Sequence, residues 1–167
     1  MIPASLSAAL GALGLAPVCH VHAPLRTVED AHAIWDGLAG AQVKNLFIKD
    51  AGRQYWLVVV PGDPRMDTKA LAPLIGSKRI SFGSADDLRA ILGVEPGSVT
   101  PLAMMNDARR QVRLVIHAPL MRADRLLVHP LVNTATLEMA PGDLARFLDA
   151  HDVAPALVDL SAAFLAA

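Results

Sequence analysis

The sequence lacks several features that would assign it to a familiar class of protein. One cysteine, Cys19, is present among 167 residues, so neither an internal disulfide nor a cysteine-rich zinc site can form. Aromatic residues make up only 4%, which leaves the core mainly to Ala, Leu and Val. No apolar run approaches the roughly 20 residues that cross a bilayer, and the N-terminus lacks the basic stretch of a signal peptide. These absences predict a cytoplasmic protein without a membrane segment.

The sequence also lacks an excess of charge of either sign. Fifteen Lys and Arg residues face sixteen Asp and Glu residues, which gives a formal net charge of −1. This balance is not typical of a general nucleic-acid binder, so a nucleic-acid partner would have to be held by a local basic patch. The length and a hydrophobic content of 53% predict a single domain, residues 1–167, and we expect it to be monomeric.

The hydrophobic pattern mixes short helices and short strands without strict alternation. The spacing of Leu6, Leu10 and Leu13 predicts the first helix, and Thr27 followed by Asp30 predicts a capping box that opens the second. Gly40 is expected to stop that second helix. We expect helices at 3–15, 28–38, 67–75, 84–92 and 141–148, and strands at 18–22, 42–49, 54–60, 112–117, 126–129 and 134–139. Residues 156–160 are expected to form either a last strand or the lead-in to a terminal turn.

A Gly-containing turn between the strands at 42–49 and 54–60 indicates a hairpin, and hairpins pair antiparallel. The fold class that we expect is therefore α+β, with a central mixed or antiparallel sheet flanked by helices.

Lys44 is the first candidate functional residue. Side chains alternate between the two faces of a strand, so Lys44 shares its face with Leu46 and Ile48, which have the character of core residues. A lysine on an apolar face is costly unless its ammonium group reaches a cleft or a partner. The sequence leaves two interpretations open, a functional lysine or one that extends its ammonium group to water at the strand end.

A loop of small residues, Gly97-Ser98-Val99-Thr100-Pro101, is the second candidate. Its glycine and proline prevent a regular helix, which leaves backbone N–H groups available to bind an oxyanion or a carbonyl oxygen. An ordinary turn between a helix and a strand is the alternative.

The third candidate follows an apolar strand and begins at His129-Pro130. His129, Asn133 and Thr134 could together position a small polar substrate. Alternatively, Asn133 and Thr134 bond to the local backbone at a strand end.

Other candidates carry weaker signals. His20 and His22 have a spacing that can hold a metal ion, but no third ligand is evident. Cys19 lacks any nucleophile signature around it. Arg109, Arg110 and Arg113, with Lys78 and Arg79 elsewhere in the chain, could contact phosphate.

Lys44, the G-x-x-x-P loop from Gly97 to Pro101 and the segment starting at His129 occur in an order that resembles the YbaK/ProX family. That family contains free-standing aminoacyl-tRNA deacylases and the editing domain inserted in bacterial prolyl-tRNA synthetases. The run from Val43 to Phe47 and the pair Asn106-Asp107 look most like its ProX type, which hydrolyses alanine from tRNA(Pro) in trans. The resemblance also implies the YbaK-type α+β fold.

The resemblance implies a role for each candidate. Lys44 and the backbone of Gly97, Ser98, Val99 and Thr100 would be catalytic, whereas Asn45, Pro101, His129, Asn133 and Thr134 would bind the substrate. No metal ion and no cofactor would be required. The partner would be the acceptor end of mischarged tRNA(Pro), with transient contact to prolyl-tRNA synthetase or an elongation factor.

Two alternatives stay open. The mischarged amino acid could be cysteine or serine rather than alanine, or the chain could be a non-catalytic module that binds tRNA or a synthetase.

Overall fold

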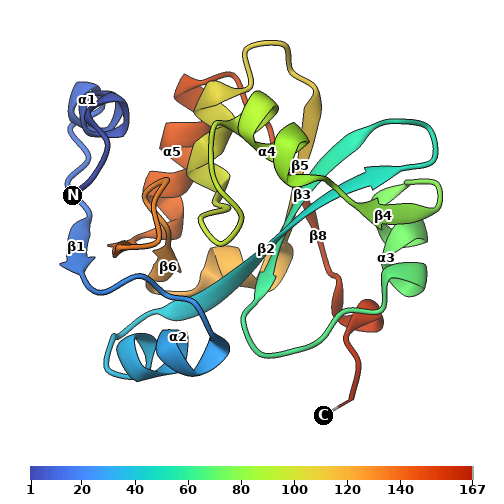
Figure 1. Ribbon diagram of the computed structural model, residues 1–167, viewed down its shortest axis with the longest axis horizontal. Coiled ribbons are helices and arrows are strands. Elements are labelled where there is room, and N and C mark those ends of the chain that lie inside the picture. The colour runs from blue at the N-terminus through green and yellow to red at the C-terminus, as the bar shows by residue number, and fades with distance from the viewer. Residues whose placement is uncertain (167) are drawn as a thin grey trace.

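A mixed sheet organises the computed structural model, which describes residues 1–166 (Figure 1). Within these residues the sheet has eight strands in the order β1-β7-β6-β2-β3-β5-β8, with β4 paired to β2. The strands are β1 (Val18–Val21), β2 (Ala41–Asp50), β3 (Tyr55–Pro61), β4 (Ile80–Phe82), β5 (Val112–His117), β6 (Leu126–Val128), β7 (Ala135–Met139) and β8 (Ala156–Val158). The helices are α1 (Ala4–Ala12), α2 (Val28–Trp35), α3 (Thr68–Ile75), α4 (Ala85–Leu92) and α5 (Pro141–Ala150), with 3-10 helices η1 (Pro101–Asn106), η2 (Ala118–Arg122) and η3 (Ser161–Ala163). The expected α+β class with a mixed sheet is confirmed.

Strand β2 divides the sheet. One of its edges pairs along most of its length with β3, antiparallel, as the predicted hairpin requires. Its other edge is shared: residues 41–42 pair in parallel with β6, and residues 48–50 pair antiparallel with β4. Between these two pairings, residues 43–46 have no strand partner on that edge among residues 1–166, and Lys44 and Asn45 lie in this gap.

The two faces of the sheet carry separate hydrophobic clusters. Val43 and Phe47 of β2 belong to the larger cluster, which also contains buried side chains of α1, α4 and α5. Ile48 belongs to the smaller cluster, which is completed by α3 and by the C-terminal residues Leu160 and Ala163. Lys44 therefore lies on the strand face of the smaller cluster, as the alternation of side chains predicts.

Local signals explain most of the helix boundaries. Thr27 and Asp30 form the predicted capping box, and Ser84 caps α4, which ends at Gly93 in the left-handed conformation. The expected stop at Gly40 is wrong, since α2 already ends at Trp35. Gly40 serves packing instead: a Cβ atom there would lie 2.8 Å from the Leu127 side chain, so a larger residue would force that side chain to shift.

Within residues 1–166, no helix is both long enough and apolar enough to cross a membrane.

Candidate active site

A cavity of about 470 Å³ opens beside the gap in the sheet. Its walls come from α2 and the segment before it, the start of β2, the loop after β3, and the loop around Gly97. Five of the residues predicted from the sequence line it: Lys44, Asn45, Gly97, Val99 and His129. The cavity thus brings together residues that lie far apart in the sequence.

The Lys44 ammonium group reaches the loop that follows β3. Its Nζ donates a hydrogen bond to the Pro64 carbonyl oxygen at 2.5 Å, and the side chain is partly buried. Burial lowers the pKa of Lys44 from its ordinary value, while the carboxylate of Asp63 acts to raise it and the Arg65 guanidinium to lower it. The lysine is therefore held in a fixed position at the cavity wall, and two of its three N–H donors stay available to a ligand.

Asn45 connects β2 to the glycine-containing loop. Its Nδ2 donates to the Val99 carbonyl oxygen at 2.9 Å, which fixes the distance between the strand and the loop. Its Oδ1 is buried and has no hydrogen-bond partner among the described residues. A buried acceptor without a partner costs free energy, of the order of 1–3 kcal/mol, unless a ligand or water satisfies it. Such an atom beside a cavity suits a substrate N–H group.

The loop from Gly97 to Pro101 has fewer free N–H groups than the sequence suggested. Gly97 has a φ of +91°, a conformation that favours glycine. The Ser98 N–H donates to the Glu95 carbonyl at 2.9 Å and is therefore occupied. Within residues 1–166, the N–H groups of Val99 and Thr100 have no intramolecular acceptor. Of these two residues only Val99 lines the cavity, so its N–H is the candidate oxyanion donor.

Three residues of this loop lie behind the cavity wall rather than in it. Ser98 is 5% exposed and Thr100 is fully buried, and Pro101 is the buried first residue of η1. The Thr100 hydroxyl accepts a hydrogen bond from the Leu102 N–H at 3.3 Å and so caps η1. The side chains of this group hold the loop in shape, and none of them lines the cavity.

Asn133 and Thr134 also lie outside the cavity lining. The Asn133 amide donates to the Leu25 carbonyl at 3.3 Å, and the Thr134 carbonyl accepts from the His22 N–H at 3.0 Å. Both residues hold the segment that leads to α2, so they act on the cavity through its wall.

His129 lines the cavity beside Trp35, with their ring centroids 5.8 Å apart. Burial lowers its pKa, partly opposed by a hydrogen bond with the Ala135 backbone and reinforced by the neighbouring His22. Its Nδ1 is buried without a partner among the described residues. A neutral imidazole in this position can orient a substrate by one hydrogen bond and by contact of its ring.

Several residues at the site were not identified from the sequence. Trp35 falls within the helix expected at 28–38 and was not singled out, yet it lines the cavity, and its Nε1 donates to the buried Thr136 hydroxyl at 3.0 Å. The sequence gives no sign of the loop with Asp63 and Pro64. This loop binds the Lys44 ammonium group through a backbone carbonyl, and every residue has such a carbonyl.

The weaker candidates are either bonded to other groups or exposed. His20 Nε2 lies 3.0 Å from Glu138 Oε2, and Cys19 is exposed. In the part of the chain that the structure describes, no cluster of three or more His, Cys, Asp or Glu side chains could hold a metal ion. Asn106 and Asp107 serve the fold: the Asn106 amide donates to the Leu92 carbonyl, and the Asp107 carboxylate accepts from the N–H groups of Gln111 and Val112.

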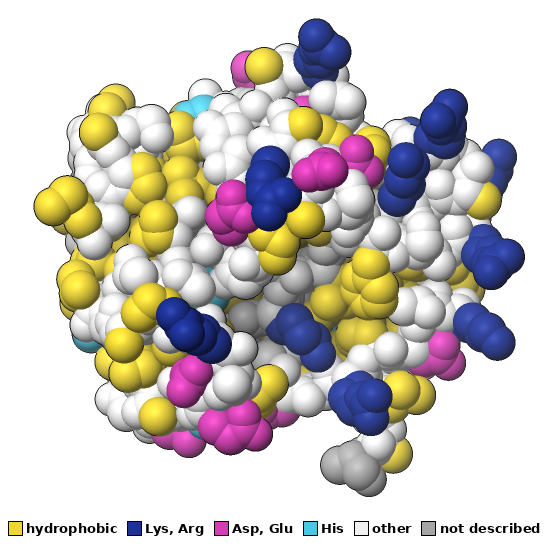
Figure 2. Space-filling model, viewed as in Figure 1, with side chains coloured by type: hydrophobic (Ala, Val, Ile, Leu, Met, Phe, Trp, Pro, Cys, Tyr) yellow, Lys and Arg dark blue, Asp and Glu magenta, His cyan; other side chains and the backbone are white. Residues whose placement is uncertain are grey.

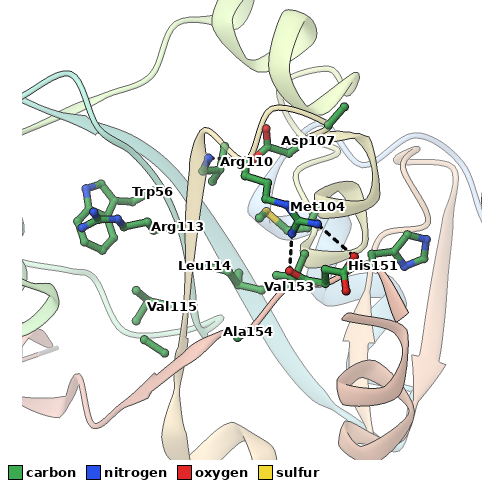
Figure 3. A pocket seen from close by; sticks show the side chains of 14 residues that line it. Trp56, Met104, Asp107, Arg110, Arg113, Leu114, Val115, His151, Val153 and Ala154 are labelled. Atoms are coloured by element: carbon green, nitrogen blue, oxygen red, sulfur yellow. Dashed lines mark hydrogen bonds and ion pairs between the residues drawn. The ribbon is translucent and has the colours of Figure 1, made fainter. Parts of the chain in front are cut away.

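A second cavity, of about 510 Å³, lies between β5 and the turn after α5 (Figure 3). It is slightly the larger of the two, but none of the residues predicted for catalysis or substrate binding lines it. Arg110 at its rim is paired with Asp152, and Arg113 lies over the Trp56 ring, 5.2 Å from its centroid. Its cationic groups are thus already engaged, and we take the cavity at Lys44 as the candidate active site.

The site and fold agree with a family assignment. The chain belongs to the family of aminoacyl-tRNA editing domains, whose model matches residues 22–147. It is therefore an aminoacyl-tRNA deacylase, a hydrolase of the ester that joins an amino acid to tRNA, as the sequence resemblance predicts.

Particular relatives narrow this assignment. The chain is 37% identical over 131 residues to the prolyl-tRNA editing protein ProX of Acetoanaerobium sticklandii, covering 78% of this chain and 80% of that protein. It is 36% identical over 148 residues to the prolyl-tRNA synthetase associated domain-containing protein 1 of Xenopus laevis, covering 86% and 88%. A solved structure described as a candidate trans-editing enzyme for prolyl-tRNA synthetase superposes with a TM-score of 0.68 over 95% of this chain and 98% of the other, at 18% identity. This last likeness shows the fold alone.

Proposed function

We propose that this protein edits mischarged tRNA(Pro) in trans, hydrolysing alanyl-tRNA(Pro) to free alanine and tRNA(Pro). The observation that carries the proposal is the meeting of three groups at one cavity of about 470 Å³: the Lys44 ammonium, the unpartnered Asn45 Oδ1 and the free Val99 N–H. The relative named prolyl-tRNA editing protein ProX supports tRNA(Pro) as the carrier of the amino acid.

A cell needs such an activity because a proline site cannot strictly exclude smaller amino acids. Alanine loses only a few methylene contacts there, and each is worth roughly 1–3 kcal/mol. A second site that admits alanine and excludes proline by size corrects the error.

The reaction is the attack of water on the aminoacyl carbonyl, which places negative charge on the carbonyl oxygen. The Val99 N–H group stabilises that charge, because Val99 lines the cavity and this N–H has no other acceptor within residues 1–166. The family resemblance implies that the neighbouring ribose hydroxyl of the tRNA helps to activate the water.

The side chains at the cavity bind and orient the substrate. Lys44 holds the terminal nucleotide by charge and hydrogen bonding, and Asn45 Oδ1 accepts from the substrate amino group. His129 and Trp35 shape the pocket. Ser98, Thr100 and Pro101 support the oxyanion loop from behind, while Asn133 and Thr134 support the segment before α2.

The carrier tRNA is proposed to approach on the face that Figure 2 shows. Lys and Arg side chains gather there on the side that carries α3 and β4, although the chain as a whole has a net charge of −1. A local patch of this kind can contact the phosphates of an acceptor end.

Hydrolysis of a panel of mischarged tRNA(Pro) tests the proposal. Alanyl-tRNA(Pro) is expected to be cleaved at least about tenfold faster than prolyl-tRNA(Pro), since exclusion of the larger ring by the cavity walls is worth roughly 1–3 kcal/mol. Faster cleavage of cysteinyl- or seryl-tRNA(Pro) would move the specificity to that amino acid, and no cleavage of any of them would indicate a non-catalytic binding module.

Lys44→Ala is the matched test of the site. Deacylation is expected to fall by more than about 100-fold, because the substrate loses its charged anchor and a misplacement of about 1 Å can by itself cost 10²-fold. Circular dichroism should show an unchanged fold, because within residues 1–166 the side chain makes a single hydrogen bond. Arg146→Gln, at an exposed residue of α5 that lies outside the cavity lining, is the control and should keep full activity. Full activity in Lys44→Ala would remove this lysine from the mechanism.

A further inference from the structure

We propose that the C-terminal segment, residues 159–165, positions Lys44 by holding the loop of residues 62–67 against it. This segment lies outside residues 22–147, which the family model matches, so family membership assigns it no role. The expected effect on activity rests on the function proposed above, whereas the state of the Lys44 side chain can be measured without any substrate.

The segment pairs with the loop through its backbone (Figure 1). The Leu165 N–H donates to the Arg65 carbonyl at 2.8 Å, and the Asp67 N–H donates to the Ala163 carbonyl at 2.8 Å. Between these two bonds, Met66 and Phe164 form an antiparallel bridge. Three consecutive loop residues, 65–67, are therefore fixed by the C-terminal segment, directly after Pro64.

The segment is itself anchored on the sheet. Leu160 and Ala163 are fully buried in the smaller hydrophobic cluster, against which the Phe164 side chain packs. His117 of β5 accepts a hydrogen bond from the Leu160 N–H at its Nδ1, at 3.0 Å, and its ring lies 5.0 Å from that of Phe164. The segment that holds the loop is thus attached to the buried core of the sheet through β5.

The loop in turn surrounds the Lys44 ammonium group. Pro64 supplies its hydrogen-bond acceptor, and the exposed side chains of Asp63 and Arg65 supply the nearest charges. Upstream, the loop is held by the Gly62 N–H, which donates to the Gln42 carbonyl at 3.0 Å. Downstream of Pro64, the pairing with the C-terminal segment keeps the acceptor at Lys44, so loss of that pairing releases the lysine to solvent.

Phe164→Ala is the variant that weakens the pairing, and Leu165→Ala is its matched control. Leu165 is the next residue, but its side chain is exposed and only its backbone N–H takes part. Phe164→Ala is expected to lower kcat/KM for alanyl-tRNA(Pro) roughly 10- to 100-fold, the cost of a misplacement of about 1 Å. Leu165→Ala should stay within about twofold of the unmodified protein, and Phe164→Leu, which keeps apolar bulk, should recover most of the activity.

The second measurement is the titration of Lys44 by NMR in protein carrying 13C-labelled lysine, with its signal assigned by its loss in Lys44→Ala. In Phe164→Ala the pKa of Lys44 is expected to rise toward its ordinary value as the ammonium group regains water, with no such rise in Leu165→Ala. A purely structural role for Phe164 would lower the melting temperature without this rise.

The proposal is overturned if the Lys44 titration is the same in Phe164→Ala and in the unmodified protein. Should Phe164→Ala fail to fold, Phe164→Val and Met66→Ala weaken the same bridge from either side and decide the question by the same titration. An unmodified protein that cleaves no mischarged tRNA(Pro) would refute the proposed function, and the titration would still decide whether the segment positions Lys44.

Discussion

A single buried hydroxyl organises one wall of the cavity. Thr136 is fully buried in β7, and its Oγ1 accepts from Trp35 Nε1 at 3.0 Å and lies 2.9 Å from His22 Nε2. His22 Nδ1 lies 2.8 Å from the Ala23 carbonyl, which can only accept, so Nδ1 carries the proton. In the neutral form of His22 the Thr136 hydroxyl then donates to Nε2, and all three side chains are satisfied in one arrangement.

Thr136→Val tests this arrangement. The substitution keeps the shape but leaves the indole N–H of Trp35 without its acceptor, a loss of about 1–3 kcal/mol of folding free energy. We expect Trp35 to shift and the preference for alanyl- over prolyl-tRNA(Pro), measured as the ratio of their kcat/KM values, to fall several-fold. Thr136→Ser retains the hydroxyl and should retain the ratio. An unchanged ratio in Thr136→Val would show that the position of Trp35 does not set specificity.

The sequence could not assign this role to Thr136, although it could single out Lys44. A lysine among apolar residues on one face of a strand is unusual, and the five residues from Lys44 to Ile48 are enough to reveal it. A threonine in a strand is ordinary, and its partners Trp35 and His22 lie 101 and 114 residues away along the chain. Only the tertiary structure brings them together.

The helices and strands show the same difference between local signals, which the sequence reveals, and long-range pairing, which it does not. The hairpin β2–β3, the capping box of α2 and the helix α4 were predicted because each signal lies within a few residues. Strand β4 was not predicted, since its three residues form a strand through pairing with residues 48–50 of β2. The pattern of apolar residues likewise gave no sign that residues 159–165 pair with the loop after β3.

The pairing of β5 with the C-terminal segment predicts a dependence of stability on pH. Burial lowers the pKa of His117, with Asp159 opposing and Arg122 reinforcing the shift. The folded state therefore binds a proton less readily than the unfolded chain, whose histidines titrate near 6.5, so stability falls as pH drops below about 6.5. The melting temperature should decrease between pH 7 and pH 5.

His117→Asn provides the control for this decrease. The asparagine Oδ1 can accept from the Leu160 N–H without titrating, so the melting temperature should depend less steeply on pH. Some dependence should persist because burial also lowers the pKa of His129. An equally steep decrease in His117→Asn would show that other groups govern the acid sensitivity.

At the scale of the whole molecule, a balanced total charge is combined with an uneven distribution of charge (Figure 2). A small contact with an acceptor end neutralises only a few phosphates, and each contributes a slope of about −0.7 to −0.9 to the logarithm of the binding constant against the logarithm of salt concentration. For three contacts we expect a slope of roughly −2 to −3.

Lys78→Gln, at the exposed start of the turn before β4, should reduce the slope by about one if this lysine contacts phosphate. Arg146→Gln, on α5, removes a charge that is already paired with Asp143 and should leave the slope unchanged. A flat response to salt in the unmodified protein would instead indicate recognition by packing and hydrogen bonds within the cavity alone.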